Sequence, residues 1–162
     1  MTIVSNTGPL IALAKADKLP LLKQLFRRIC IPPAVHRELL AKTGPEAARL
    51  DDALARFIEI TPAPQIPPEV KAVTLRLGVG EKQAIALAYE LKAPLMIDDR
   101  LGRSAARRLG LAIIGLAGVL IQAKEAGLIP AVLPLLEEIR RRGYWLSDEL
   151  LDVAARFAGE AE

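Results

Sequence analysis

The sequence predicts an α/β fold in which a parallel central sheet is covered by helices on both faces. Short apolar runs rich in β-branched residues alternate with helical patterns along the whole chain, and this alternation is typical of parallel sheets. The chain has 162 residues, of which 52% are hydrophobic. Because this size and apolar content suit one globular core, we expect a single domain over residues 1–162.

The first half of the chain is expected to contain three strands separated by helices. Pro9 and the pair Pro32-Pro33 mark helix starts, because a residue in the first turn needs no N–H hydrogen bond within the helix. Four prolines within residues 61–68 predict an extended connection. The expected elements are a strand over 2–5, a helix entered through a turn at 6–9, a helix near 19–26, a strand over 28–31, a helix from 32, a polar helix around 46–56 and a strand over 57–60.

The second half repeats the alternation and then ends in helices. Glycines in residues 77–80 open a helix, and Gly143 is expected to end one. The expected elements are a helix over 81–91, a buried strand over 95–97, a helix with a basic face over 101–109, a short strand over 112–114, an apolar helix over 115–126, and two final helices around 131–142 and 148–157.

Neither a membrane span nor a secretory signal is expected. The longest uncharged stretch, residues 109–123, contains fifteen residues and three glycines, whereas a span needs about 20 apolar residues. The first residues do not combine a basic region with an apolar run, so we expect a cytoplasmic protein.

Composition narrows the possible chemistry. The chain has one cysteine, Cys30, and one histidine, His36, which excludes an internal disulfide and makes a structural zinc site improbable. Most catalytic triads would require His36 as the base, and we assign His36 no role. The 22 basic residues against 19 acidic ones give a formal net charge of +3, which permits contact with a polyanion.

The polar residues nearest the strand ends are the first candidates for function, since ligands of parallel α/β folds bind beyond the carboxyl ends of the strands. Asn6 follows the first strand, Glu38 lies in the helix after the second, and Asp98 and Asp99 follow the later buried strand. Glu81 stands in the first turn of its helix. If these ends lie side by side, their like charges require a cation. Such oxygen ligands suit Mg²⁺ or Mn²⁺ and water activation against a phosphodiester, so the pattern indicates a nuclease.

Each of these residues also has an ordinary structural explanation. Glu81 would interact favourably with a helix dipole, and Asp98 could be the N-cap of the next helix with Asp99 in its first turn. Glu38 could be solvated on a helix surface, and Asn6 could form an Asx turn. None of the residues taken alone indicates a function.

Taken in order, the motifs resemble those of the PIN-domain family. They are NTGPLIAL at 6–13, IPPAVHREL at 31–39, GEKQAIALA at 80–88 and IDDR at 97–100. The match is closest to a little-characterised prokaryotic subgroup related to VapC-like toxin ribonucleases. The resemblance continues through GVL at 118–120, GLI at 127–129, PLL at 134–136 and WLSD at 145–148, so it covers nearly the whole chain.

The resemblance implies a PIN-like α/β/α sandwich with additional C-terminal helices. It implies a ribonuclease dependent on Mg²⁺ or Mn²⁺, often a homodimer, often a toxin inhibited by an antitoxin protein. Carried over by position, the metal set is Asn6, Glu38, Glu81, Asp98 and Asp99, the last four also being catalytic. The family usually has Asp where this chain has Asn6, and a carboxamide lacks the charge that favours Mg²⁺.

Residues for binding RNA are expected next to this acidic set. Thr7 follows the first metal position, and the spacing of Arg100, Arg103 and Arg107 places them on one face of a helix, where they could reach phosphates. A solvated helix face explains the arginines equally well.

Two other functions compete with the nuclease. A dinucleotide site would use residues 73–77 as a strand, the glycines of 78–80 as the phosphate turn, and Asp98 on the ribose. Against this reading, Glu81 would put a negative charge where the pyrophosphate binds. The other alternative is a PIN-like module that binds nucleic acid or protein without turnover because of Asn6.

Overall fold

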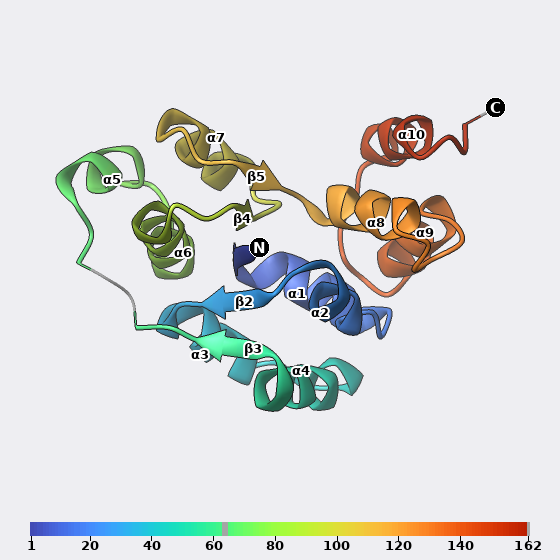
Figure 1. The fold of residues 1–162 in the computed structure, drawn as a ribbon, viewed down its shortest axis with the longest axis horizontal. Coiled ribbons are helices and arrows are strands. Elements are labelled where there is room, and N and C mark those ends of the chain that lie inside the picture. Colours follow the sequence, from blue (N-terminus) through green and yellow to red (C-terminus); the bar gives the residue numbers. More distant parts are fainter. Residues whose placement is uncertain (63–64, 162) are drawn as a thin grey trace.

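A computed structural model describes residues 1–62 and 65–161 and shows a five-stranded parallel sheet flanked by helices (Figure 1). The strands are β1 (Thr2–Ser5), β2 (Arg28–Ile31), β3 (Ile58–Ile60), β4 (Leu95–Met96) and β5 (Ile113–Ile114). The helices are α1 (Thr7–Lys15), α2 (Pro20–Leu25), α3 (Pro33–Leu40), α4 (Pro45–Arg56), α5 (Pro68–Val73), α6 (Val79–Leu91), α7 (Arg100–Arg108), α8 (Leu116–Glu125), α9 (Leu133–Arg141) and α10 (Asp148–Phe157).

The strand order is β3-β2-β1-β4-β5, so β1 lies at the centre of the sheet. Val4 pairs with Cys30 of β2 on one side and with Leu95 of β4 on the other. Beyond this register the Asn6 N–H donates to the Met96 carbonyl oxygen at 2.9 Å. The carboxyl ends of β1, β2 and β4 therefore meet at one edge, as the predicted site requires.

The helices form layers around an apolar core. α3 packs against α1, α4 and α6, and α1 also packs against α4, while α7 contacts α6 and β5. α9 and α10 pack on each other and on α1 and α8 respectively, at the end of the molecule opposite α5 (Figure 1). The central strand is fully buried at Ile3 and Val4, which accounts for the apolar runs in the sequence. The α/β prediction, the parallel sheet and the additional C-terminal helices are confirmed.

Several predicted element limits need correction. α1 begins at Thr7 and α6 at Val79 rather than at Glu81. A short helix, α5, occupies residues 68–73, where no helix was expected, and Pro68 in its first turn is the signal that sequence reasoning missed. Residues 74–78 form a turn instead of the strand that a dinucleotide site would need, so that alternative is wrong. Residues 63 and 64 of the expected connection lie outside the described residues.

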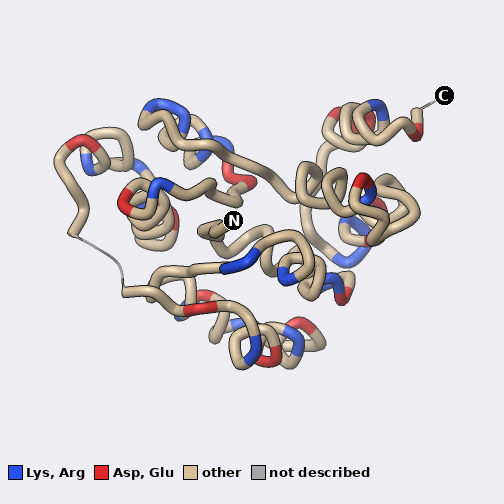
Figure 2. The backbone as a smooth tube through the Cα atoms, viewed as in Figure 1, with Lys and Arg blue, Asp and Glu red and all other residues tan. Residues whose placement is uncertain are grey.

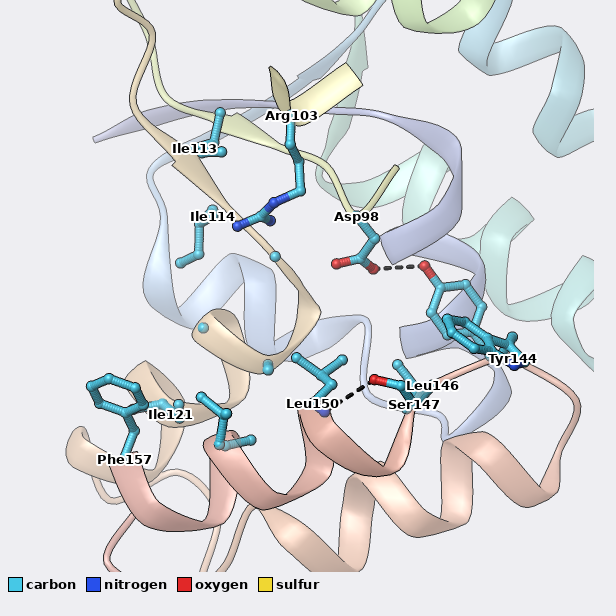
Figure 3. A pocket seen from close by; sticks show the side chains of 16 residues that line it. Asp98, Arg103, Ile113, Ile114, Ile121, Tyr144, Leu146, Ser147, Leu150 and Phe157 are labelled. Atoms are coloured by element: carbon cyan, nitrogen blue, oxygen red, sulfur yellow. Dashed lines mark hydrogen bonds between the residues drawn. The ribbon is translucent and has the colours of Figure 1, made fainter. Parts of the chain in front are cut away.

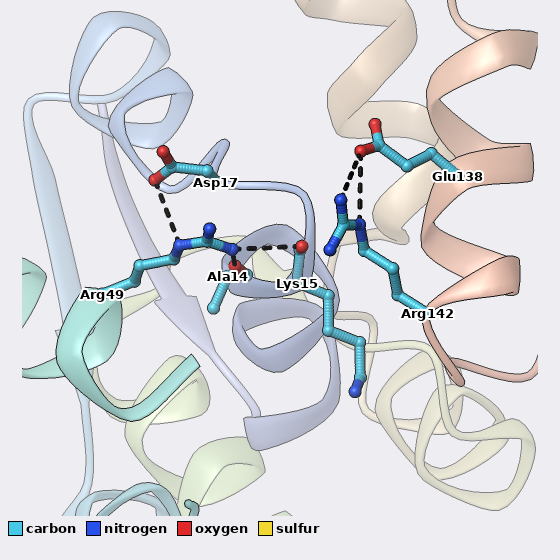
Figure 4. A network of polar contacts seen from close by, with 6 residues as sticks. All are labelled: Ala14, Lys15, Asp17, Arg49, Glu138 and Arg142. Atoms are coloured by element: carbon cyan, nitrogen blue, oxygen red, sulfur yellow. Dashed lines mark hydrogen bonds and ion pairs between the residues drawn. The ribbon is translucent and has the colours of Figure 1, made fainter. Parts of the chain in front are cut away.

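A side chain from a distant helix completes the C-terminus of α1. Arg49 of α4 donates to the carbonyl oxygens of Ala14 at 2.8 Å and Lys15 at 3.2 Å, and lies 3.6 Å from Asp17 (Figure 4). This contact satisfies acceptors that a helix end leaves free. In the same view the Arg142–Glu138 pair links successive turns of α9.

Glu160 similarly caps the start of α9. Its carboxylate accepts from the backbone N–H groups of Val132 at 2.7 Å and Leu133 at 2.8 Å, and from Lys124 Nζ at 2.9 Å. No helix within residues 1–62 and 65–161 is long and apolar enough to cross a membrane.

Candidate active site

Asn6 directly follows the central strand, and its side chain is buried without a hydrogen bond to its amide oxygen. It precedes α1 in an extended conformation, yet its side chain makes no capping hydrogen bond. Its Oδ1 atom is buried and has no hydrogen-bond partner among the described residues. A buried oxygen without a partner costs about 1–3 kcal/mol. The Asx-turn explanation therefore does not account for Asn6, and a bound ligand would.

Thr7 and Glu38 meet beside Asn6. The buried Thr7 hydroxyl donates a short hydrogen bond to Oε2 of Glu38, which reaches it from α3. The Glu38 carboxylate also rests against the first turn of α6. A Cβ at Gly80 would lie 3.0 Å from its Cδ and collide with Oε1, so glycine is needed there to let the carboxylate approach.

Glu81 and Asp99 stand at the starts of two helices. The Glu81 carboxylate folds back over the α6 N-cap, with Oε2 3.0 Å from where a Cβ of Gly78 would be. Asp99 is the N-cap of α7, and its Oδ2 accepts from the Gly102 N–H at 2.7 Å. The expected capping role belongs to Asp99 and not to Asp98, because α7 begins at Arg100.

Asp98 is held by two distant segments. Its Oδ1 accepts from the Leu116 N–H at the start of α8 at 2.9 Å. Its Oδ2 accepts from the Tyr144 hydroxyl at 2.6 Å (Figure 3). Burial, followed by the charge of Asp98 and the hydrogen bond to it, raises the pKa of Tyr144 well above its usual value. Asp98 thus fastens β4 to the C-terminal helices.

The Tyr144 hydroxyl also touches the start of α1. A Cβ at Gly8 would lie 3.0 Å from this oxygen, so Tyr144 bridges Asp98 and the turn that carries Asn6 and Thr7. Tyr144 is one of the residues lining a cavity of about 540 Å³ between α8 and α10.

The three candidate arginines of α7 lie in different surroundings. Arg103 Nη1 donates to the Ile97 carbonyl oxygen at 2.8 Å and points into the cavity that Asp98 lines (Figure 3). Arg100 and Arg107 are exposed. The geometry therefore leaves Arg100 and Arg107 available for a ligand and assigns Arg103 to support of the strand end.

The candidate donors share one edge of the sheet but are not gathered into a compact acidic cluster. Within the described residues, no three Asp, Glu, His or Cys side chains lie close enough together to hold a metal ion. The Thr7 hydroxyl and the Glu38 carboxylate are in hydrogen-bond contact and Asn6 precedes Thr7 in the chain, and of these three side chains only Glu38 carries a charge.

Two residues with positioning roles escaped sequence reasoning. Gln83 of α6 accepts from the Ala34 N–H at 2.9 Å and so fixes α3, which carries Glu38, against α6. The nearby GEKQAIALA motif could have drawn attention to Gln83. Tyr144 had no such local signal, because its partner Asp98 lies 46 residues earlier in the chain.

The fold and site define an α/β/α sandwich with polar residues along the carboxyl edge of a parallel sheet. A family model described as DUF3368, PIN domain, matches residues 2–160. The chain therefore belongs to the PIN-domain family, as its motifs predicted. No protein of curated function matches the sequence. PIN domains are generally nucleases that act on RNA or DNA and use divalent metals.

Proposed function

We propose that this protein is a ribonuclease that hydrolyses RNA phosphodiester bonds with Mg²⁺ or Mn²⁺. The observation that carries the proposal is the buried, unpartnered Oδ1 of Asn6 at the carboxyl end of the central strand. Family membership supports nuclease chemistry in general, and the orphaned oxygen indicates where a ligand would be held.

The donor chemistry fits a hard divalent cation. Asn6, Glu38, Glu81 and Asp99 supply only oxygen atoms, which Mg²⁺ and Mn²⁺ prefer. Three carboxylates do not meet within the described residues, so cation binding in this proposal requires the half-buried Glu81 to turn toward Asn6 while Glu38 keeps its hydrogen bond to Thr7. In this proposal Asp98 is a positioning residue, since both of its oxygens already accept hydrogen bonds.

A bound cation would neutralise charge on the phosphate and acidify a water molecule. The protein's own contribution is to hold the donors in place. Thr7 orients one oxygen of Glu38 and leaves the other free, while Gly80 gives the carboxylate room. Arg100, next to Asp99, and Arg107, in the last turn of α7, would supply positive charge for the RNA backbone.

The alternative is a PIN-like module that binds RNA or a protein without turnover. It is favoured by the lack of three clustered acidic side chains in the described part of the chain and by the neutral Asn6. Such a module would keep the fold and the exposed arginines but bind the cation too weakly for hydrolysis.

Cleavage of a mixed RNA pool with Mg²⁺, Mn²⁺ or EDTA distinguishes the two functions. The native chain is compared with Asn6→Asp, Asp99→Asn and, as a matched control, Asp152→Asn on the exposed face of α10. We expect metal-dependent cleavage that Asp99→Asn abolishes and Asp152→Asn preserves. A gain in Asn6→Asp would measure what the carboxamide costs. If neither the native chain nor Asn6→Asp cleaves RNA, the ribonuclease proposal is wrong and the binding module stands.

The family resemblance also suggests a cellular role and binding partners. We propose a toxin role with an antitoxin partner, a homodimer and a cytoplasmic location. Light scattering of the purified chain tests the dimer, and co-purification with the product of a neighbouring gene tests the antitoxin.

A further inference from the structure

A second cavity, of about 300 Å³, lies between α7 and the turn that follows α5. One wall is a single face of α7, formed by Leu101, Ser104, Ala105 and Arg108 at helical spacing. The other wall includes Leu75 and Arg76. Because α7 rises about 1.5 Å per residue, the α7 wall runs for about 10 Å away from the start of that helix. We refer to this cavity as the α5–α7 groove.

The groove exposes apolar side chains to solvent. Leu75 is 68% exposed and Leu101 is 59% exposed, although both line the same cavity. Single exposed leucines are common on protein surfaces, but two that face one hollow offer an apolar slot for a ligand.

The groove is also positively charged. Within residues 1–62 and 65–161, Arg76 and Arg108 have no acidic partner within ion-pair distance and make no side-chain hydrogen bond. Other exposed arginines, such as Arg37 and Arg141, are also unpaired in the described part of the chain, but Arg76 and Arg108 line one hollow together with two exposed leucines. Figure 2 shows basic residues at both ends of α7. An apolar slot flanked by free guanidinium groups is complementary to a flat base carried on an anionic backbone.

One end of the groove adjoins the proposed metal site. Leu77, which lines the groove, precedes Gly78, against which the Glu81 carboxylate rests. Leu101 comes two residues after Asp99. The groove and the proposed site are therefore built on the same two chain segments, residues 77–81 and 99–101.

We propose that the α5–α7 groove holds one unpaired nucleotide of the RNA next to the bond that is cleaved. The base lies against Leu75 and Leu101, and the adjoining phosphates bind Arg76 and Arg108. This inference rests on the proposed ribonuclease function and adds a substrate subsite to it. It also assigns specificity for single-stranded over paired RNA to this groove, since a paired base cannot enter the slot.

The test measures binding of a fluorescent 12-nucleotide single-stranded RNA in EDTA, so that binding is read without cleavage. Arg76→Ala and Arg108→Ala are each expected to weaken binding by about tenfold at low salt and to reduce the slope of log K against log salt by about 0.7. Leu75→Ser and Leu101→Ser are expected to weaken it by about threefold without changing the slope. The four side chains are at or near the surface, so these variants should fold.

The matched controls are Arg141→Ala and Leu40→Ser, which change exposed residues outside the groove and should leave binding unchanged. The inference is overturned if the groove variants bind like the controls, or if a duplex of the same sequence shows the same dependence on Leu75 and Leu101. If the groove variants still cleave at saturating RNA while Asp99→Asn does not, the groove contributes to binding RNA and the metal site contributes the cleavage, as proposed. If no variant cleaves RNA while the groove variants lose binding, the groove stands as a nucleotide-binding site but not as a subsite of a nuclease, and the ribonuclease proposal fails.

Discussion

Removing the Tyr144 hydroxyl tests whether its hydrogen bond to Asp98 stabilises the fold. In Tyr144→Phe, the Asp98 Oδ2 atom loses a hydrogen bond of 2.6 Å in a half-buried position. Hydrogen bonds to charged groups contribute about 1.5–3 kcal/mol, and partial exposure places this one near the lower end, at about 1–2 kcal/mol. For a chain of this size, 1 kcal/mol corresponds to about 2–4 °C, so we expect the Tm to fall by about 2–8 °C.

Thermal unfolding followed by circular dichroism measures this change. The matched control is Tyr89→Phe, because the Tyr89 hydroxyl also donates to a carboxylate, that of Glu69, but at 3.1 Å on the surface. The control should lower the Tm by less than Tyr144→Phe does, because an exposed contact with a carboxylate contributes little to stability. If Tyr144→Phe unfolds at the same temperature as Tyr89→Phe, the hydrogen bond between Tyr144 and Asp98 does not stabilise the fold.

The native chain and Tyr144→Phe should also differ in how their stability depends on alkaline pH. The folded state raises the pKa of Tyr144, chiefly through burial and then through Asp98, whereas in the unfolded chain it is about 10. The stability linked to the protonated hydroxyl is therefore present below pH about 10 and is lost as the pH rises further. The native chain should lose stability over this range, and Tyr144→Phe should lose less.

Three further changes test other contacts. Lys92 ends α6 with a φ of 52°, so Lys92→Gly should raise the free energy of unfolding by about 1 kcal/mol in urea titrations, whereas Lys92→Ala should not, since alanine keeps the Cβ. Glu160→Ala should lower the Tm by about 2–8 °C at pH 7, because two N–H groups at the start of α9 lose their acceptor. Burial raises the pKa of Glu160, but the hydrogen bonds from Lys124 and from two backbone N–H groups have the larger combined effect, so the pKa of Glu160 in the folded chain is below its usual value. The stability that Glu160 contributes is therefore present above pH about 4.5 and is lost as the pH falls further. A Tm difference that is undiminished at pH 3 would contradict this role of Glu160. Gly80→Ala should displace the Glu38 carboxylate and reduce RNA cleavage by at least about tenfold without lowering the Tm, and unchanged cleavage would show that Glu38 is not needed in its observed place.

The sequence alone predicted the architecture because its signals are local. Alternation of apolar runs with helical patterns indicated the parallel sheet, and prolines marked the starts of α3 and other helices. The chain order of Asn6, Glu38, Glu81, Asp98 and Asp99 indicated which strand and helix ends to propose as the functional site. These signals act through backbone geometry and burial, which depend on neighbours a few residues away.

Tertiary structure decided what the candidate side chains contact. Asp98 and Asp99 are adjacent in the sequence, yet Asp99 caps its own helix while Asp98 binds Leu116 and Tyr144. Arg103 shares a helical face with Arg100 in the sequence but turns to the Ile97 carbonyl oxygen. A side chain's direction depends on which donor or acceptor a distant element presents to it. Because α7 begins at Arg100, the N-cap is Asp99 and the carboxylate of Asp98 is left to bind other segments. For that reason the sequence determined where the polar residues lie along the sheet edge, and only the packing of α7, α8 and the segment around Tyr144 decided which of them remain free to bind a ligand.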